Sequence, residues 1–251
     1  MTRYRTIDLA RMVKIHPNTV RFYEEIGFIS TAPRSPSGYR LFDDRHLYQI
    51  KICRCIYDCG WLGREIRAAS LSIIRAMREW DIPRAVEATQ IYRDKINSEY
   101  QTARKTAQIL QRWANRKTFR LSRNKYSHKQ AATLLGVTPE VLRNWERNKL
   151  IQIPRTGKNQ TRVYSDREIE RLRIIYMLRQ SKYSISAIYA SLNQYDRGVT
   201  QGMVEALNAP GNPEDRSWVW VGDCWLKALK NNIKGALKVQ ALLEEIKNIP
   251  L

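Results

Sequence analysis

Apolar side chains recur at spacings of three and four residues along most of the chain, which is the period of an amphipathic helix. Residues 7–13 place three apolar side chains on one helical face. A second short helix follows, with His16 at its N-cap, Pro17 at its first position and Gly27 as its stop. The N-terminal region is therefore predicted to form two short helices joined by a tight turn.

The second of these helices has a counterpart far along the chain. Residues 16–29 read HPNTVRFYEEIGFI, and residues 138–151 read TPEVLRNWERNKLI in the same rhythm. Apart from a one-residue adjustment in a loop, a shift of 122 residues aligns the two regions. The aligned pairs are Pro17 with Pro139, Arg21 with Arg143, Tyr23 with Trp145, Glu24 with Glu146, Ile29 with Ile151, Arg40 with Arg162, Phe42 with Tyr164, Asp44 with Asp166, Leu47 with Ile169 and Ile66 with Ile188. Two separated copies indicate a duplicated module and not a solenoid.

Each copy continues with a short basic loop between β-prone ends, which favours a hairpin. The loops are APRSPSGYRLF at 32–42 and IPRTGKNQTRVY at 153–164. In the second copy, Thr138 is expected to cap the preceding helix, because its hydroxyl can accept a free backbone N–H. Further helices are predicted at 44–57 and 166–179, followed by short ones around Ile66 and Ile188.

A long helix is predicted between the two copies, over residues 83–117. Asp81 and Pro83 supply its start, and no Gly or Pro interrupts it. Its apolar stripe is Ala85, Ala88, Tyr92, Ile96, Tyr100, Ala103, Ala107, Leu110 and Ala114. Such a stripe fits a coiled coil or a long core helix, and at 1.5 Å per residue the helix would span about 50 Å. A lone amphipathic helix leaves its stripe in water, so it needs a partner.

The C-terminal residues supply a candidate partner. Gly222 and Asp223 are predicted to cap a helix that runs to about residue 248. Its expected stripe is Leu226, Leu229, Ile233, Ala236 or Leu237, Gln240 and Leu243. The predicted fold is mainly α, with two winged helix-turn-helix domains, a long coiled-coil helix joining them and a C-terminal coiled-coil helix. The predicted boundaries are 1–75 for the first domain, 76–118 for the linking helix, 119–195 for the second domain and 196–251 for the turn-rich, Trp-rich segment and last helix.

Charge narrows the class of partner. The chain of 251 residues has 44 Lys and Arg against 24 Asp and Glu, a formal net charge of +20. Such an excess favours phosphates or anionic membranes as partners. No run approaches the roughly 18 apolar residues that a membrane span needs, and MTRYRTIDLARMV lacks the features of a signal peptide. A cytoplasmic, nucleoid-associated protein is therefore expected.

Catalytic and metal chemistry find little support in the sequence. No Walker motif, paired acid cluster or nucleophile–base arrangement stands out, so an enzyme is not expected. Cys55 and Cys59 lie four apart on one helical face, but Cys53 points elsewhere and the three histidines are scattered. Zinc needs about four converging donors, so buried reduced thiols are expected, with no metal and no cofactor.

The order of these parts resembles the winged helix-turn-helix domain of the MerR family. The resemblance lies in RFYEEIGFI, PRSPSGYRLF and CGWLGREI in the first copy, and in RNWERNKLI, PRTGKNQTRVYSDREIERL and KYSISAI in the second. It covers a little over half of the chain. It implies a transcription regulator that places its second helix in the major groove of double-stranded promoter DNA and its wing along the backbone. It also implies bending and untwisting of a promoter with an overlong spacer, together with RNA polymerase.

Candidate DNA contacts follow from the helix faces and the loops. Val20 and Tyr23, with Leu142 and Trp145, share a packing face, whereas Arg21 and Arg143 suit a phosphate or guanine contact. The candidates of the first copy are Asn18, Thr19, Arg21, Phe22, Tyr23, Arg34, Ser37, Tyr39 and Arg40, and Glu25 lies on the same reading face. Those of the second copy are Glu140, Arg143, Asn144, Trp145, Arg147, Arg155, Lys158 and Arg162. Tyr23 and Trp145 fit the core or the DNA backbone, with the core preferred.

The sequence allows more than one interpretation of how the chain assembles and of what it does. In MerR-like dimers the long helices of two subunits pair antiparallel, so a chain with two heads fits an intramolecular pseudo-dimer whose heads read different bases. The rival is a four-headed homodimer. An architectural or recombination accessory DNA-bending protein is a second functional class. Residues 208–225 hold Trp218, Trp220 and Trp225, which favour a hydrophobic plug or, as the sharper reading, an aromatic pocket for a drug-like ligand.

Overall fold

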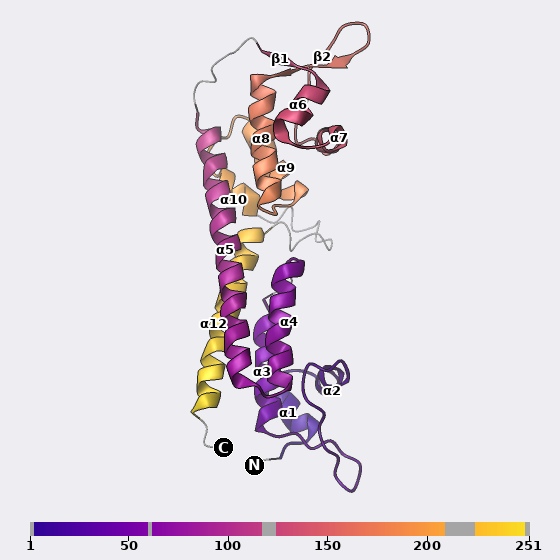
Figure 1. Cartoon of the computed structure of the whole chain (residues 1–251), viewed down its shortest axis with the longest axis vertical. Coiled ribbons are helices and arrows are strands. Elements are labelled where there is room, and N and C mark those ends of the chain that lie inside the picture. Colours follow the sequence, from indigo (N-terminus) through magenta and orange to yellow (C-terminus); the bar gives the residue numbers. More distant parts are fainter. Residues whose placement is uncertain (1–2, 60–61, 117–123, 209–223, 249–251) are drawn as a thin grey trace. The chain divides into compact units, whose positions relative to one another are not determined.

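The computed structural model describes residues 3–59, 62–116, 124–208 and 224–248. Within it the chain forms two compact units. Unit 1 comprises Met1–Ser98 and Ala228–Leu251, and unit 2 comprises Glu99–Lys227. Each unit holds one copy of the sequence repeat, together with part of a long helix (Figure 1). The mainly α fold class is confirmed.

The head of unit 1 is built from four helices and a short wing. The helices are α1 (Thr6–Met12), α2 (Pro17–Glu25), α3 (Asp44–Tyr57) and α4 (Arg64–Arg78). The start of α2 is as predicted, because the His16 side chain accepts a hydrogen bond from the Asn18 N–H at 3.1 Å. Gly27 follows the helix with a φ of 73°. The helix around Ile66 is not short, since α4 has 15 residues.

The head of unit 2 repeats this arrangement with small strands added. Its elements are β1 (Lys125–Tyr126), α6 (His128–Leu135), α7 (Pro139–Arg147), β2 (Arg155–Thr156), β3 (Thr161–Arg162), β4 (Tyr164–Ser165), α8 (Asp166–Gln180), α9 (Ile185–Asp196) and α10 (Met203–Asn208). Strands β1 and β4 pair antiparallel, as do β2 and β3. Thr138 is the N-cap residue of α7 as predicted, but the capping hydrogen bond expected of its hydroxyl is wrong, because its side chain accepts none; Pro139 follows at the first helical position.

Helix α5 (Ile82–Ala114) is the predicted long helix and has 33 residues. Its predicted stripe is confirmed: Tyr100 is half-buried, and the other eight positions are buried. The helix passes without a break from unit 1 into unit 2, since the two units divide between Ser98 and Glu99. Each unit therefore uses a different part of the same helix as a wall of its core.

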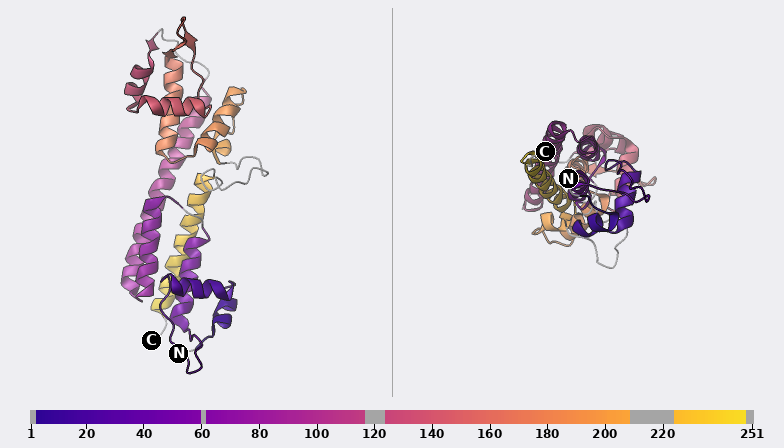
Figure 2. Two further views of the ribbon diagram at one scale, coloured as in Figure 1. Left: turned by 90° about the vertical axis from the view of Figure 1, so that its right-hand side faces the viewer. Right: turned by 90° about the horizontal axis from the view of Figure 1, so that it is seen from below.

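Helix α12 (Trp225–Lys247) lies beside the first part of α5 in unit 1 and runs in the opposite direction (Figures 1 and 2). Within unit 1 the two helices are joined by side-chain hydrogen bonds, from Tyr92 to Asn232 and from Arg93 to Gln240. The predicted stripe needs correction, because Leu237 is half-exposed and Gln240 is exposed. Gly235 is buried, and the buried side chains are Trp225, Leu229, Asn232, Ala236, Val239, Leu243 and Ile246, which alternate spacings of four and three.

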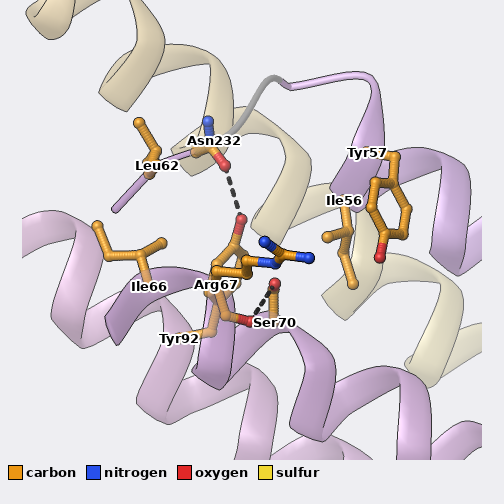
Figure 3. A pocket seen from close by; sticks show the side chains of 8 residues that line it. All are labelled: Ile56, Tyr57, Leu62, Ile66, Arg67, Ser70, Tyr92 and Asn232. Carbon is orange, nitrogen blue, oxygen red and sulfur yellow. Dashed lines mark hydrogen bonds between the residues drawn. The ribbon is translucent and has the colours of Figure 1, made fainter. Parts of the chain in front are cut away.

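Asn232 is the polar member of that seam. Its Oδ1 accepts a hydrogen bond from the Tyr92 hydroxyl at 2.8 Å, and its Nδ2 donates to the Cys59 carbonyl at 2.9 Å. Figure 3 shows this pair beside a cavity of about 20 Å³, which has room for little more than one water molecule. A buried amide with three protein partners fixes the register of α12 against α5 and the end of α3.

The second part of α5 packs against the head of unit 2. The hydroxyls of Thr106 and Ser181 lie 2.7 Å apart, and the Tyr183 hydroxyl donates to the Ala103 carbonyl at 3.0 Å. Gln111 reaches the segment that leads into α10, where it accepts from the Met203 N–H at 3.0 Å. The last half of α5 is thus a component of the second head.

Candidate nucleic-acid interface

The scaffold of each head fixes which side of its second helix faces solvent. In α2, Val20 has no exposed surface and Tyr23 is 8% exposed. The equivalent residues of α7, Leu142 and Trp145, are 2% and 4% exposed. Tyr23 and Trp145 therefore occupy core positions, as preferred, and a contact of either with the DNA backbone stays a prediction.

The opposite face of α2 carries the candidate reading residues of the first head. Asn18 and Arg21 are exposed, and the Arg21 guanidinium donates to the Asn18 Oδ1 at 3.2 Å. Phe22 is 53% exposed, which is unusual for a large apolar side chain, and Thr19 is half-buried. An amide, a guanidinium and an apolar ring match adenine, guanine and the thymine methyl group, respectively.

The equivalent face of α7 has different chemistry. Glu140 accepts hydrogen bonds from Arg143 at 2.8 Å and from Arg147 at 2.9 Å, and all three side chains are exposed. The hydrogen bond from Arg143, with the charge of Arg147, holds the pKa of Glu140 below its usual value. Asn144 is half-buried, and its Oδ1 accepts from Asn148 at 2.8 Å. The second head therefore presents one acid between two arginines, where the first presents one amide, one arginine and an aromatic ring.

Each head carries a basic wing beside this helix. In the first head, Arg34 and Arg40 form a β-bridge, and the Arg34 guanidinium donates to the Gly38 carbonyl at 3.1 Å. Ser37 is exposed at the tip, and Tyr39 is 62% exposed with the Arg5 guanidinium 5.7 Å from its ring centre. The positive φ of Gly38, 82°, is the conformation that this tight turn requires.

The wing of the second head is the β2–β3 hairpin. Arg155 and Lys158 are exposed on it, and Gly157 has a φ of 73°. Arg155 pairs with Arg162 in the antiparallel register. Both wings therefore offer backbone N–H groups and cations on a turn beside the exposed helix face, which is an arrangement suited to phosphates.

An ion pair connects wing and helix in both heads. Arg40 donates to Glu24 at 2.5 Å, and Arg162 donates to Glu146 at 2.7 Å. Arg155 adds a second contact to Glu146 at 3.2 Å. The side chains of Arg40 and Arg162 are each 27% exposed, so both arginines hold the wing as well as adding positive charge. Sequence reasoning assigned these arginines to DNA and missed their partners, although the repeat aligns Glu24 with Glu146.

The cysteines lie apart from this interface. Cys53 is buried, Cys55 and Cys59 are half-buried, and none of the four cysteines forms a disulfide. Burial raises the pKa of Cys53 to about 12 and also raises the pKa of Cys55 and of Cys59, so these thiols keep their protons at neutral pH. In the described part of the chain, no group of three His, Cys, Asp or Glu side chains is placed to hold a metal.

Only part of the Trp-rich segment, residues 208–225, lies within the described residues. Trp218 and Trp220 lie outside the described residues, whereas Trp225 is 5% exposed at the start of α12. The aromatic pocket stays a prediction. Among the described helices, none combines the length and the apolar character that crossing a bilayer would require.

Comparison with known proteins gives family matches for both heads. The model of the MerR family regulatory protein matches residues 5–42, and the model of the MerR HTH family regulatory protein matches residues 126–195. No solved structure matches the chain significantly.

Three HTH-type transcriptional regulators are each similar to part of this chain. The uncharacterized HTH-type transcriptional regulator slr0701 of Synechocystis is 34% identical over 59 residues, which are 24% of this chain and 43% of the relative. The HTH-type transcriptional regulator ZntR of Escherichia coli K12 is 31% identical over 64 residues, 26% of this chain and 45% of ZntR. CueR of Escherichia coli O6:H1 is 32% identical over 54 residues, 22% of this chain and 40% of CueR.

The chain thus spans less than half the length of each of these three relatives. The two family models, however, match separate segments, and each segment contains a helix-turn-helix and a wing. The chain therefore carries two MerR-type helix-turn-helix domains, one in each of the segments that match the family models.

Proposed function

We propose that this chain is a sequence-specific transcription regulator that binds double-stranded promoter DNA through two heads with unlike reading faces. The observation that carries the proposal is the comparison of α2 with α7, the second helices of the two heads. Their buried sides match, and both have an arginine at the aligned position, Arg21 or Arg143. Their exposed sides differ in chemical type at the neighbouring positions, as Asn18 and Glu140 do.

The two kinds of contact have separate roles in this proposal. The cations of the wings, Arg34 in the first head and Arg155 and Lys158 in the second, bind phosphates and fix the register on the duplex. The exposed residues of α2 and α7 enter the major groove and read base edges. The relatives are named HTH-type transcriptional regulators, which supports this use of the helices.

The path of the chain supports an intramolecular pseudo-dimer. Helix α5 follows the first head, and its second part packs in unit 2, whereas α12 follows the second head and packs in unit 1. Each head is thus completed by the helix that follows the other head. One chain would then do what two subunits do in a symmetric dimer, and it would bend and untwist a promoter for RNA polymerase while staying on the nucleoid.

Footprinting of the full chain on its own upstream region, combined with sedimentation, tests the proposal. We expect an asymmetric footprint with two unlike half-sites about one helical turn or a multiple of it apart, bound by one chain. A perfect palindrome, or an obligate dimer without DNA at every concentration, would contradict two unlike heads on one chain. Protection of many unrelated sites would instead indicate an architectural or recombination accessory protein.

A further inference from the structure

A cavity of about 440 Å³ opens in unit 1, away from the exposed faces of α2 and the wing. It lies between the end of α1, the middle of α3 and the last part of α12. Its volume falls in the range of sites that hold small organic ligands, roughly 300–1,000 Å³. The cavity in Figure 3 is different in kind, because its volume of about 20 Å³ suits only water.

The inner wall of the larger cavity is apolar. Met12 and Val13 come from the end of α1, and Ala241 and Leu242 come from α12. Met12 is 49% exposed although it is a large apolar side chain at the end of a packed helix. Its exposure leaves apolar surface available to a ligand, and covering that surface would be favourable.

Three cations surround this wall. Lys51 and Arg54 project from α3, and Lys238 projects from α12. Arg54 is paired with Asp58 at 2.8 Å, and Lys51 lies 4.8 Å from the centre of the Tyr48 ring. Within the described residues, no carboxylate lies at ion-pair distance from Lys238 or Lys51.

One carboxylate, that of Glu245, lines the cavity, and it already accepts a hydrogen bond. Glu245 accepts a hydrogen bond from the Tyr48 hydroxyl at 2.6 Å. The lining therefore has more cationic than anionic side chains, and neither Lys51 nor Lys238 forms an ion pair with another described residue. An anionic group placed between Lys51 and Lys238 would be attracted by both.

We propose that this cavity binds a small amphipathic carboxylate, with the carboxylate at Lys51 and Lys238 and the apolar body against Met12 and Leu242. Neither a purely polar anion nor an uncharged apolar molecule uses both parts of the lining. The ligand contacts α1, the first helix of the helix-turn-helix, and α12, the helix that follows the other head. It therefore stabilises the docking of α12 on the first head.

The site belongs to the first head alone. The repeat aligns Lys51 with Arg173, Arg54 with Tyr176 and Cys55 with Met177, so the second head keeps one of the two cations of α3. The part of α12 that lines the cavity, from Lys238 onward, also belongs to unit 1 and not to unit 2. One ligand per chain is expected.

Calorimetric titration of the full chain with decanoate, below its micelle concentration, tests the site. We expect saturable binding of one decanoate per chain and no comparable binding of decyltrimethylammonium. Lys238→Glu should weaken decanoate binding by about tenfold or more, since it replaces an attraction by a repulsion. The matched control is Lys234→Glu, a charge reversal at an exposed position one turn earlier on α12, which should leave binding unchanged.

Three results would overturn the proposal: absence of saturable binding, equal weakening by Lys238→Glu and Lys234→Glu, or equal binding of the cationic probe. Thermal unfolding with and without decanoate supplies a second readout that needs no DNA. Decanoate should raise the unfolding temperature of the unaltered chain and not that of Lys238→Glu. A chain that shows these effects but binds no DNA would contradict the proposed function and leave the ligand site standing.

Discussion

Arg162 donates a hydrogen bond to Glu146 at 2.7 Å, and the aligned residues of the first head, Arg40 and Glu24, make the same contact at 2.5 Å. The carboxylate stands on the second helix of its head, α2 or α7, and the guanidinium stands in the wing. Because the contact recurs in both copies, an ion pair between wing and helix is a shared feature of the two heads. In the second head, where β2 and β3 have only two residues each, this pair joins the wing to α7.

Glu146→Gln separates the two roles of Arg162. The substitution weakens the pair while leaving the positive charge of the wing intact. If the pair positions the wing, DNA affinity falls several-fold and the unfolding free energy falls by about 1 kcal/mol, as for partly buried charged hydrogen bonds. Fluorescence anisotropy with operator DNA and chemical denaturation measure the two effects.

The control for this pair is Arg84→Ala. Arg84 and Glu79 form an ion pair whose side chains are 57% and 59% exposed, so its loss should change stability by less than about 0.5 kcal/mol. If Glu146→Gln tightens DNA binding, Arg162 acts mainly as a direct phosphate contact, and the positioning role is refuted.

Glu140→Gln should release the two arginines of α7. In the unaltered chain, Glu140 neutralises part of the charge of Arg143 and Arg147 and would repel phosphates. We expect tighter binding to all sequences, a steeper dependence of affinity on salt and weaker discrimination at one base of the second half-site. Anisotropy titrations at several salt concentrations measure this, with Glu87→Gln on the exposed side of α5 as the control. Unchanged discrimination would show that Glu140 reads no base.

Gly235→Ala should destabilise unit 1 although alanine favours helices. A Cβ at this position would lie 2.4 Å from the Cys59 Sγ and 2.5 Å from the Cys55 carbonyl oxygen, so α12 would have to move away from α3. We expect a loss of about 1–3 kcal/mol in the unfolding free energy, as for overpacking. Adding Cys59→Ala should recover only part of it, because the Cys55 oxygen belongs to the backbone. A gain in stability for Gly235→Ala would mean that α12 does not approach α3 this closely.

Asn232→Leu removes the polar contact within the α5–α12 seam. It leaves the Tyr92 hydroxyl without the hydrogen bond it donates, and we expect a loss of about 1–3 kcal/mol. The double variant with Tyr92→Phe should lose less than the sum of the two single variants, since each removes the same contact. Denaturation of the four proteins gives this coupling energy. Strict additivity would exclude a direct Tyr92–Asn232 bond.

Alkaline pH should weaken unit 1 through Tyr48. Burial, with the hydrogen bond to Glu245, raises the pKa of Tyr48 to about 12. Because the folded chain holds this proton more tightly than the unfolded chain does, the stabilisation is complete below the ordinary tyrosine pKa of about 10 and is lost as the pH rises through about 12. Tyr48→Phe should flatten the stability profile in this window. The exposed Tyr39 provides the matched control, and an equal flattening by Tyr39→Phe would contradict the assignment.

Local signals in the sequence determined most of the elements. The positions of Pro17 and Gly27 fixed the limits of α2, because a proline at the first turn and a glycine at positive φ act within a few residues. The length of α5 followed from a stripe without Gly or Pro. The repeat identified the reading faces, since packing positions stayed alike and exposed ones changed. The four-part division into domains stays a prediction beside the two units that the contacts define.

Other features were decided only by the tertiary structure. The face of α12 is the clearest case, because apolar residues lie on adjacent sides of that helix and its partners, α3 and α5, bury Asn232 and Val239 while leaving Leu237 half-exposed. The tertiary structure also decided the partners of Arg40 and Arg162, the missing capping hydrogen bond of the Thr138 hydroxyl, and the cavity between α1, α3 and α12. Caps and stripes are properties of neighbouring residues, whereas a buried register, an ion pair sixteen residues apart or a cavity depends on which elements meet.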